Sequence, residues 1–302
     1  MFLLQYSSSS LSWSKMDDIL TEMSISDLEK LAKMYENRKK SLPHLYSFLR
    51  NCLKAKGQGM KDFVRVFALN DDSWKSDGTF IASMPNHGHD IVLHSLDPLG
   101  QNLMKALRKT RKFKYLQDPA RNYTFFYAVH EQFAWKIMEL LLEQNQEILS
   151  KDFLNMWVLD KEKATKIESN IQGVFVEKIQ EQDLKIVNEN WQFRYPESQE
   201  KLLDWFKLNQ GSGVYQKSDK KLVSWVVASC LGQMSALGTL PGHEKQGYGT
   251  LAVRHMAKKL SEDGLDCCAT VYPENTVSER LLTKIGFRKM FRCQFIAVCN
   301  KN

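Results

Sequence analysis

The sequence predicts an α/β protein, because signals for helices and for β-strands alternate through most of its 302 residues. Leu28, Leu31 and Met34 recur at helical spacing near the start of the chain. Three short runs rich in Val, Ile and Phe then follow one another between residues 62 and 96, separated by turn-forming segments. After residue 174 strand-like runs alternate with amphipathic segments again. The content of 43% apolar and 25% charged residues is that of a globular protein.

The first half should open with a helix from Ser26, since Ser26 and Glu29 form a capping-box pattern. A second helix should follow Pro43 and end before Gly57. Three strands, a helix, a strand, a helix and a strand are then expected over residues 62–69, 78–84, 89–96, 99–114, 121–129, 133–149 and 152–159. The three consecutive strands predict a meander.

The polar stretch 161–173 is the best candidate for a linker, so a first domain is expected over residues 1–160 and a second over 174–302. Strands in the second half are expected at 174–179, 213–216, 222–229, 233–240, 266–272 and 291–298, and helices at 181–191, 198–208, 246–260 and 276–285. The uncharged run 222–243 contains several Ser and Gly residues and a Pro, so we interpret it as two neighbouring strands and expect no membrane span.

Charge and cysteine content narrow the class of protein. The formal net charge is +7, and the most basic run, residues 105–114, fits a helix with a solvated outer face and no aromatic stacking set, so no nucleic-acid partner is expected. The six cysteines form no CxxC pair and have no partnering His spacing, so we expect no metal site and a reducing compartment. Residues 1–15 resemble neither a secretory signal nor an Arg-rich transit peptide. An intracellular location is expected, cytoplasmic or mitochondrial.

The segment with the most chemical information runs from Gly232 to Gly249, GQMSALGTLPGHEKQGYG, and leads directly into a helix. A strand should end at Leu240, a Pro-Gly pair breaks it, and Gly247 and Gly249 bracket the helix start. Backbone N–H groups at such a helix start can cradle an anion such as a pyrophosphate. Glycines there can equally serve only a tight turn. Neither the GxGxxG of a Rossmann site nor the GxxxxGK[ST] of a P-loop is present.

Three segments within about residues 172–298 match a known family in order: LVSWVVAS, GQMSALGTLPGHEKQGYGT and YPENTVSERLLTKIGFRKM. Together with IVNENW at 186–191 they resemble the glycine N-acyltransferase-like family of the GNAT acyltransferase superfamily. The resemblance implies a tandem GNAT-like α/β fold with mixed, mostly antiparallel sheets flanked by helices. Residues 1–160 would be a degenerate GNAT-like domain, and residues 174–302 the acyl-CoA-binding domain.

The resemblance also implies which residues contact acyl-CoA or CoA. The strand before the cradle splays from its neighbour, and its backbone holds the pantetheine arm. The implied contacts are Leu237, Gly238, Thr239 and Leu240 with the pantetheine, Lys245, Gln246, Gly247, Tyr248, Gly249 and Thr250 with the pyrophosphate, and Asn275 and Ser278 at the next helix start. In the implied reaction an amine loses a proton and attacks the thioester carbonyl, and CoA thiolate leaves.

Three positions depart from the family pattern. Glu244 stands where a Gln or Arg is usual, and Gln233 where these enzymes carry a Glu that serves as general base. Leu282 stands where many GNAT enzymes have a Tyr that serves as general acid. An amide cannot accept a proton, so His243 is a substitute candidate for the base. A lone His in a PGH turn is more often a solvated loop residue.

We therefore expect an acyl-CoA-dependent N-acyltransferase that transfers an acyl group to glycine or another small amine. The catalytic candidates are Gln233 and His243, the co-substrate is acyl-CoA, and a monomer without metal is expected. The alternative, motivated by Gln233 and Leu282, is a catalytically weakened acyl-CoA-binding or regulatory protein.

Overall fold

The computed structural model describes residues 18–60, 63–85, 90–113, 123–165, 171–196 and 198–301. The expectation for residues 1–15 lies outside these residues, and the expected linker 161–173 is described in part.

The first half has strands β1 (Leu20–Glu22), β2 (Arg65–Leu69), β3 (Phe80–Met84), β4 (Asp90–His94), β5 (Thr124–His130) and β6 (Gln146–Leu159), and helices α1 (Ile25–Glu36), α2 (Pro43–Gly57), α3 (Trp74–Asp77), α4 (Gln101–Lys109) and α5 (Glu131–Glu143). Strands β2, β3 and β4 form the predicted antiparallel meander. The predicted start of the first helix is wrong by two residues, because Ser24 is the cap: its Oγ accepts the Asp27 N–H at 3.1 Å.

The predicted boundary between the helix 133–149 and the strand after it is also wrong. Helix α5 ends at Glu143, where Asn145 turns the backbone into the left-handed region with φ 60°. Strand β6 begins at once, with Gln146 opposite Asn300. The apolar residues at 148 and 149 suit a helical face as well as a strand, so pattern alone misassigned them.

The second half has strands β7 (Val174–Lys178), β8 (Gly211–Gln216), β9 (Leu222–Ala228), β10 (Gln233–Thr239), β11 (Cys267–Val271) and β12 (Arg288–Asn300), helices α6 (Lys161–Ala164), α7 (Leu184–Glu189), α8 (Ser198–Asn209), α9 (Tyr248–Glu262) and α10 (Thr276–Ile285), and the 3-10 turn η3 (Glu181–Asp183). Each strand expected in this half is present. Trp205, Trp225, Cys267 and Cys268 are buried.

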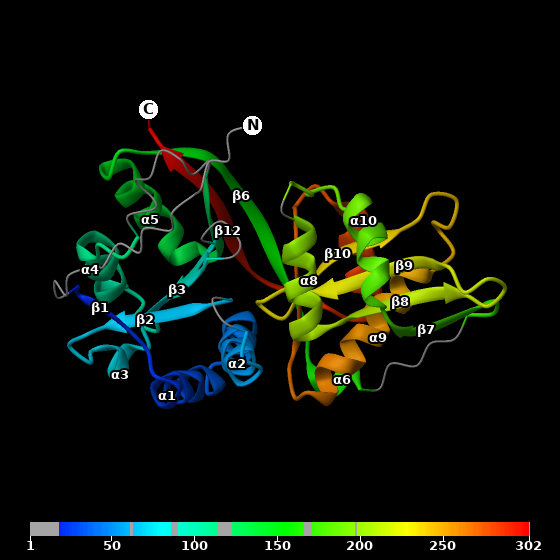
Figure 1. Ribbon diagram of the computed structural model, residues 1–302, viewed down its shortest axis with the longest axis horizontal. Helices are drawn as coiled ribbons and strands as arrows, with labels where there is room; N and C mark the ends of the chain where they lie inside the picture. Colours follow the sequence, from blue (N-terminus) through cyan, green and yellow to red (C-terminus); the bar gives the residue numbers. More distant parts are fainter. Residues whose placement is uncertain are drawn as a thin grey trace, which may run out of the picture.

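The strands of both halves form one mixed, mostly antiparallel sheet with helices on its faces, in the order β1-β2-β3-β4-β5-β12-β6-β11-β10-β9-β8-β7 (Figure 1). Among the described strands, the β4–β5 and β10–β11 pairs are parallel. The predicted α/β fold class is therefore confirmed.

Two long strands join the halves. Strand β12 lies between β5 and β6 and runs antiparallel to both. The last residues of β6 pair with β11 as well, with Leu159 opposite Cys267. Figure 1 shows β6 and β12 running side by side between the halves, with the C terminus over the first half. The final strand therefore completes the sheet of the first half.

Helix α2 of the first half packs against the turn between β9 and β10. Asn51 Nδ2 donates a hydrogen bond of 2.9 Å to the carbonyl oxygen of Cys230. A Cβ at Gly232, which has φ 67°, would lie 2.7 Å from Ser47 Cβ. This contact brings the first half against the segment that leads into β10.

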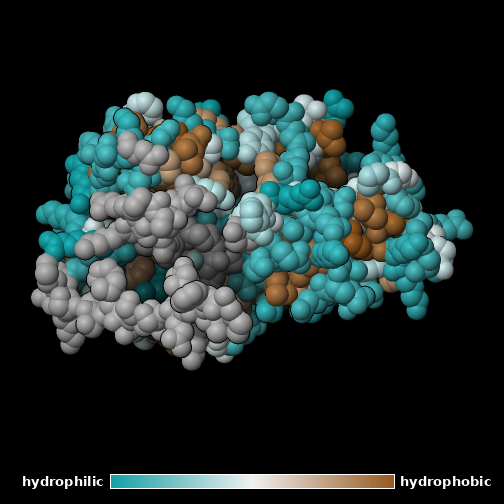
Figure 2. All heavy atoms as spheres, turned by 45° about the horizontal axis from the view of Figure 1, so that its top comes forward, coloured by the Kyte–Doolittle hydropathy of each residue, from teal (hydrophilic) through white to brown (hydrophobic). Residues whose placement is uncertain are grey.

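The outer surface is mixed. Figure 2 shows a largely hydrophilic face on which apolar side chains gather in separate small groups. The large apolar side chains exposed on the described residues are Ile25, Leu99, Trp135, Leu142, Leu149, Phe153, Phe193, Leu237 and Val277. No described helix combines the length and apolar character that a membrane crossing requires.

Candidate functional site

Strands β10 and β11 diverge within the second half. They pair in parallel only where Gln233 lies opposite Cys268 and Met234 opposite Ala269. Beyond this point β10 stays paired with β9, with a register shift between Ser235 and Gly238. Ala236 has φ 48°, a left-handed conformation that costs an L residue on the order of 1–3 kcal/mol. The bulge directs the end of β10 away from β11, which is the splay that the family resemblance implied.

The packing of Gly238 fixes the backbone of β10 after the bulge. A Cβ on Gly238 would lie 2.5 Å from Trp225 Cζ2, so the backbone rests directly on the indole. On the same strand, Thr239 Oγ1 is 2.9 Å from Ser224 Oγ, which also donates to the Gly238 carbonyl oxygen at 2.8 Å. These contacts hold one edge of residues 237–239 on β9 and leave the opposite edge facing the splay.

The start of α9 presents unbonded backbone donors. Gly247, with φ 84°, caps the helix without a side-chain bond, and the first helical bond joins the Leu251 N–H to the Gly247 oxygen at 3.0 Å. Across the described part of the chain, none of the N–H groups of residues 245–250 donates to another protein group. They lie at the positive end of a 15-residue helix and can therefore bind an anion.

The helix start and the splayed strand adjoin. A Cβ on Gly249 would lie 3.6 Å from Leu281 Cδ1, 3.7 Å from Thr239 Oγ1 and 4.0 Å from Leu237 Cδ1. Side chains of α10 and β10 thus lie next to Gly249 at the start of α9. An extended ligand that lies along β10 would therefore reach the free N–H groups of residues 245–250.

Glu244 does not compete for those donors. Its Oε2 accepts the Gly242 N–H at 2.8 Å, which turns the carboxylate toward the preceding turn. Asn275 caps α10, since its Oδ1 accepts the Ser278 N–H at 3.0 Å. This leaves the Asn275 amide nitrogen and the Ser278 hydroxyl as the groups there that can contact a ligand.

The two catalytic candidates lie at opposite ends of β10. Gln233 is 2% exposed, and its Nε2 lies 3.9 Å from Met156 Sδ, a weak contact. His243 follows the far end of the strand, where its N–H donates to the Leu240 oxygen at 3.0 Å. At ~3.3 Å per residue the strand alone separates the two by roughly 20 Å. One proton cannot be shared between them, and Gln233 is the nearer to the place where β10 leaves β11.

Sequence reasoning did not single out Tyr272, which follows the open end of β11. Its ring stacks on Phe193 with centroids 5.8 Å apart. Burial, with the nearby Asp152, raises the pKa of Tyr272 to about 12, so the phenol is protonated at neutral pH. A Tyr at the end of a strand has the pattern of a core residue, and Phe193 lies 79 positions earlier, so no local signal joins them.

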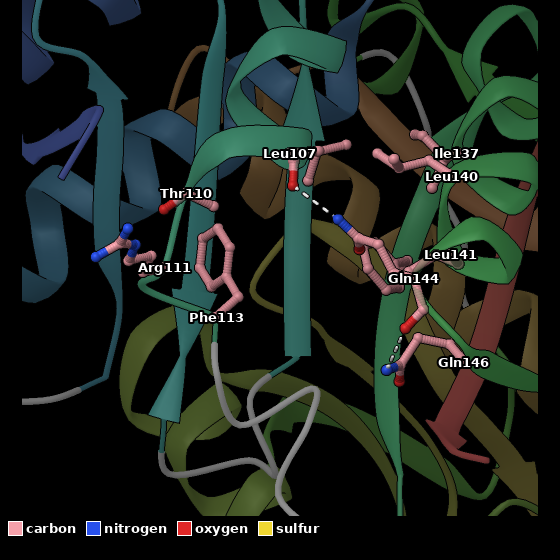
Figure 3. A pocket seen from close by; sticks show the side chains of 10 residues that line it. Leu107, Thr110, Arg111, Phe113, Ile137, Leu140, Leu141, Gln144 and Gln146 are labelled. Atoms are coloured by element: carbon pink, nitrogen blue, oxygen red, sulfur yellow. Dashed lines mark hydrogen bonds between the residues drawn. The ribbon is translucent and has the colours of Figure 1, made fainter.

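A cavity of about 110 Å³ lies in the first half, away from this site (Figure 3). Its lining is Leu107, Thr110, Arg111, Phe113, Phe126, Ile137, Leu140, Leu141, Gln144 and Gln146. The cavity lies at the C-terminal ends of α4 and α5, where the helix dipoles are negative, and most of its walls are apolar. It therefore lacks the features of an anion cradle.

No group of His, Cys, Asp and Glu side chains suited to a metal is found among the described residues.

Two family models match parts of the chain. Residues 211–296 match the family described as FR47-like protein, and residues 19–140 match a domain of unknown function, DUF5645. Among curated proteins, none matches the sequence.

Solved structures share the fold. A Drosophila protein solved by a structural genomics consortium aligns with a TM-score of 0.84 at 19% identity, over 94% of this chain and 100% of its own. A GCN5-related N-acetyltransferase from Sphaerobacter thermophilus aligns at 0.58 and 10% identity, over 92% and 94%. A tandem GNAT protein from the clavulanic acid biosynthesis pathway aligns at 0.54 and 7% identity, over 92% and 97%.

These likenesses define the class of protein: the chain has the tandem GNAT fold. More particularly, residues 211–296 of the second half, which include β9, β10, α9 and β11, are similar to the FR47-like family.

Proposed function

We propose that the protein is an acyl-CoA-dependent N-acyltransferase of the glycine N-acyltransferase-like family, with glycine or another small amine as acceptor. One observation carries the proposal: the splayed end of β10 adjoins the unbonded N–H groups that open α9. An extended ligand with an anionic end, such as CoA, fits this arrangement.

In the proposed complex the backbone of residues 245–250 binds the pyrophosphate, because a helix start with free N–H groups favours negative charge. Residues 237–240 pair with the amide groups of the pantetheine arm through the edge that β11 leaves open. Asn275 and Ser278 contact the same arm from the start of α10. No metal takes part in the proposed reaction.

In the proposed reaction the deprotonated amine attacks the thioester carbonyl, a backbone N–H at the β10 bulge stabilises the oxyanion, and CoA leaves as the thiolate. The amine proton must reach water, since Gln233 can orient the amine but cannot accept the proton. Missing one positioned base slows a reaction by roughly 100-fold to 10,000-fold without abolishing it.

The second candidate function is an acyl-CoA-binding or regulatory protein with little turnover. Gln233 and Leu282 favour it, because both proton-transfer positions of the family hold side chains that do not ionise. A thiol-release assay over a panel of acyl-CoAs and amines separates the two functions.

The binding site itself is tested by titration calorimetry with CoA and the variant Gly247→Trp, in which the side chain would fill the space before the helix start. The matched control is Gly264→Trp at the other end of α9, where the glycine has a similar φ of 79° and open space around it. We expect Gly247→Trp to lose CoA binding and Gly264→Trp to keep it. Unchanged affinity in a folded Gly247→Trp protein would show that CoA binds elsewhere.

A further inference from the structure

A buried ion pair joins the two halves. Lys201 of α8 lies with its Nζ 2.5 Å from Asp90 Oδ2 of β4, and each side chain is 3% exposed. The Tyr127 hydroxyl of β5 also bonds the Lys201 ammonium. Burial lowers the pKa of Lys201, but Asp90, Tyr127 and Tyr195 together outweigh burial and raise it, so Lys201 is protonated beside Asp90. Two charges are kept out of water only where partners of good geometry surround them.

Aromatic rings complete the surroundings of the ammonium. Its Nζ lies 4.7 Å from the ring centroid of Tyr127 and 5.6 Å from those of Tyr195 and Trp205. The first ring belongs to the first half and the other two to the second. Lys201 therefore links Tyr195 of the second half to Tyr127 and Asp90 of the first half.

Tyr195 belongs to segment 191–196, which joins α7 to α8. Ser198 Oγ lies 2.6 Å from Asn188 Oδ1 and 2.8 Å from the Tyr195 oxygen, and Trp191 packs on Trp205 with ring centroids 5.8 Å apart. These contacts fix both ends of the segment. Phe193 projects from its middle with 49% of its surface exposed and stacks on Tyr272, directly after the open end of β11.

The segment and the helix start lie on different faces of the sheet. Gln233 pairs with Cys268, and the alternation along β11 puts Tyr272 on the same face as these two. Cys267 points to the other face, where its Sγ is 3.2 Å from the Ala257 oxygen of α9. A ligand bound at α9 therefore reaches the splay from one face, while segment 191–196 borders it on the face of Gln233.

We infer that Lys201, anchored by Asp90, is a positioning residue for the acyl acceptor: by fixing Tyr195 it holds segment 191–196 as the wall against which the acceptor amine lies. The inference rests on the proposed function. It also gives the first half a role in the reaction, because Asp90 and Tyr127 act on the acceptor through Lys201 and Tyr195.

The test uses the full-length double variant Asp90→Leu/Lys201→Met, which removes both charges together and so leaves no lone buried charge. We expect the KM for the acceptor to rise roughly 10-fold to 100-fold while the KM for acyl-CoA stays the same, since a displaced wall misplaces only one substrate. Hydrogen exchange of residues 191–196 should speed up, and that of α9 should not. Lys207→Met, an exposed lysine on the same helix, is the control and should change neither.

A second pair of variants covers the case in which the double variant does not fold. Tyr195→Leu removes the ring and should raise the acceptor KM, and Tyr195→Phe keeps the ring and should restore most of the loss. Equal acceptor KM values for Leu and Phe, or unchanged exchange of 191–196 in a folded double variant, would overturn the inference. If the wild-type protein releases no thiol, the proposed function fails, and exchange still decides whether Lys201 holds the segment.

Discussion

Among single residues, Gln233 raises the question of how the acceptor amine loses its proton. The family resemblance implies a glutamate at this position. The Gln233 side chain is buried, and its Nε2 contacts the Met156 thioether. Amide and carboxylate have nearly the same shape, so the site can be converted without repacking.

Gln233→Glu should raise turnover at pH 7 by about 100-fold, because a positioned base contributes that much or more. The wild-type rate should climb from pH 7 to 9 as free amine accumulates, and the variant should show a flatter profile. Steady-state thiol release over this pH range measures both. Thiol release from neither protein, with CoA binding intact, would favour the binding function instead.

His44 gives a prediction about stability. It lies in α2 with no exposed surface, and within the described structure neither ring nitrogen has a partner. Burial, with a contribution from the nearby His130, lowers the pKa of His44 to about 3, below the ordinary 6.5. Between about pH 3 and 6.5 the imidazole is thus neutral in the folded protein and takes up a proton on unfolding. Its contribution to stability is present above pH 6.5 and is lost as the pH falls toward 3.

His44→Leu should therefore flatten the acid limb of the stability curve. The wild type should lose about 1.4 kcal/mol per pH unit from this group between pH 6 and 4, and the variant should lack that slope. Urea unfolding at each pH measures it. His94, whose pKa is also lowered by burial, should leave part of the slope in the variant. Parallel curves for the two proteins would contradict the prediction.

At the scale of an element, β10 depends on contact between its backbone and the buried ring of Trp225. Gly238→Ala should destabilise the protein by about 1–3 kcal/mol and weaken CoA binding, because Trp225 is 1% exposed and cannot move away from a new methyl group. Chemical denaturation measures the first effect and calorimetry the second.

Gly249→Ala is the matched control for stability. Gly249 lies in α9, where alanine is favoured over glycine by up to about 1 kcal/mol. Its Cβ would contact side chains of α10 and β10 at 3.6 Å or longer, which needs no rearrangement. It should leave stability unchanged or raise it. Similar stabilities for Gly238→Ala and Gly249→Ala would show that the indole does not constrain β10.

Elements with a strong local pattern could be predicted from the sequence, and their partners could not. The meander and the strand–turn–helix around Gly247 follow from apolar periodicity and glycine placement. The three-residue β1 has no pattern of its own and exists only through its pairing with β2. Ser24 was missed as a cap because Ser26 shows the same signal two residues later.

The candidate site, too, could be predicted from the sequence only in part. Its glycines and loop were visible in one continuous segment, whereas the Asp90–Lys201 pair joins residues 111 positions apart, and charge alone gave no reason to pair them. The bulge at Ala236 was equally hidden, since alanine in the left-handed region has no sequence signature.

At the scale of the whole molecule, we propose that the chain divides functionally at residues 161–173, with acyl-CoA bound by 174–302. The sheet crosses this division, because β12 lies between β5 and β6 and a hydrophobic core cluster includes residues of both halves. The first half should therefore depend on the end of the chain for its stability.

A chain truncated after residue 287 should lose cooperative unfolding of the first half, because β5 and β6 would each present an unpaired edge. Adding a peptide of residues 286–302 should restore it, as circular dichroism during thermal unfolding would show. A truncated chain that melts like the full-length protein would contradict this dependence. Removing residues 20–22, which form the edge strand β1, is the control and should have a smaller effect.

The position of β12 also sets an order of events during translation. The ribosome makes β5 and β6 first, and the 13-residue strand that lies between them follows only after the elements α6 to α10. Until then β5 and β6 have no covering strand between them, and unpaired edges of this kind recruit other chains. The sheet of the nascent first half therefore stays open and prone to aggregation while residues 160–287 are being made. A translation product that stops before Arg288 would lack this strand and would expose the edges that chaperones and proteases recognise.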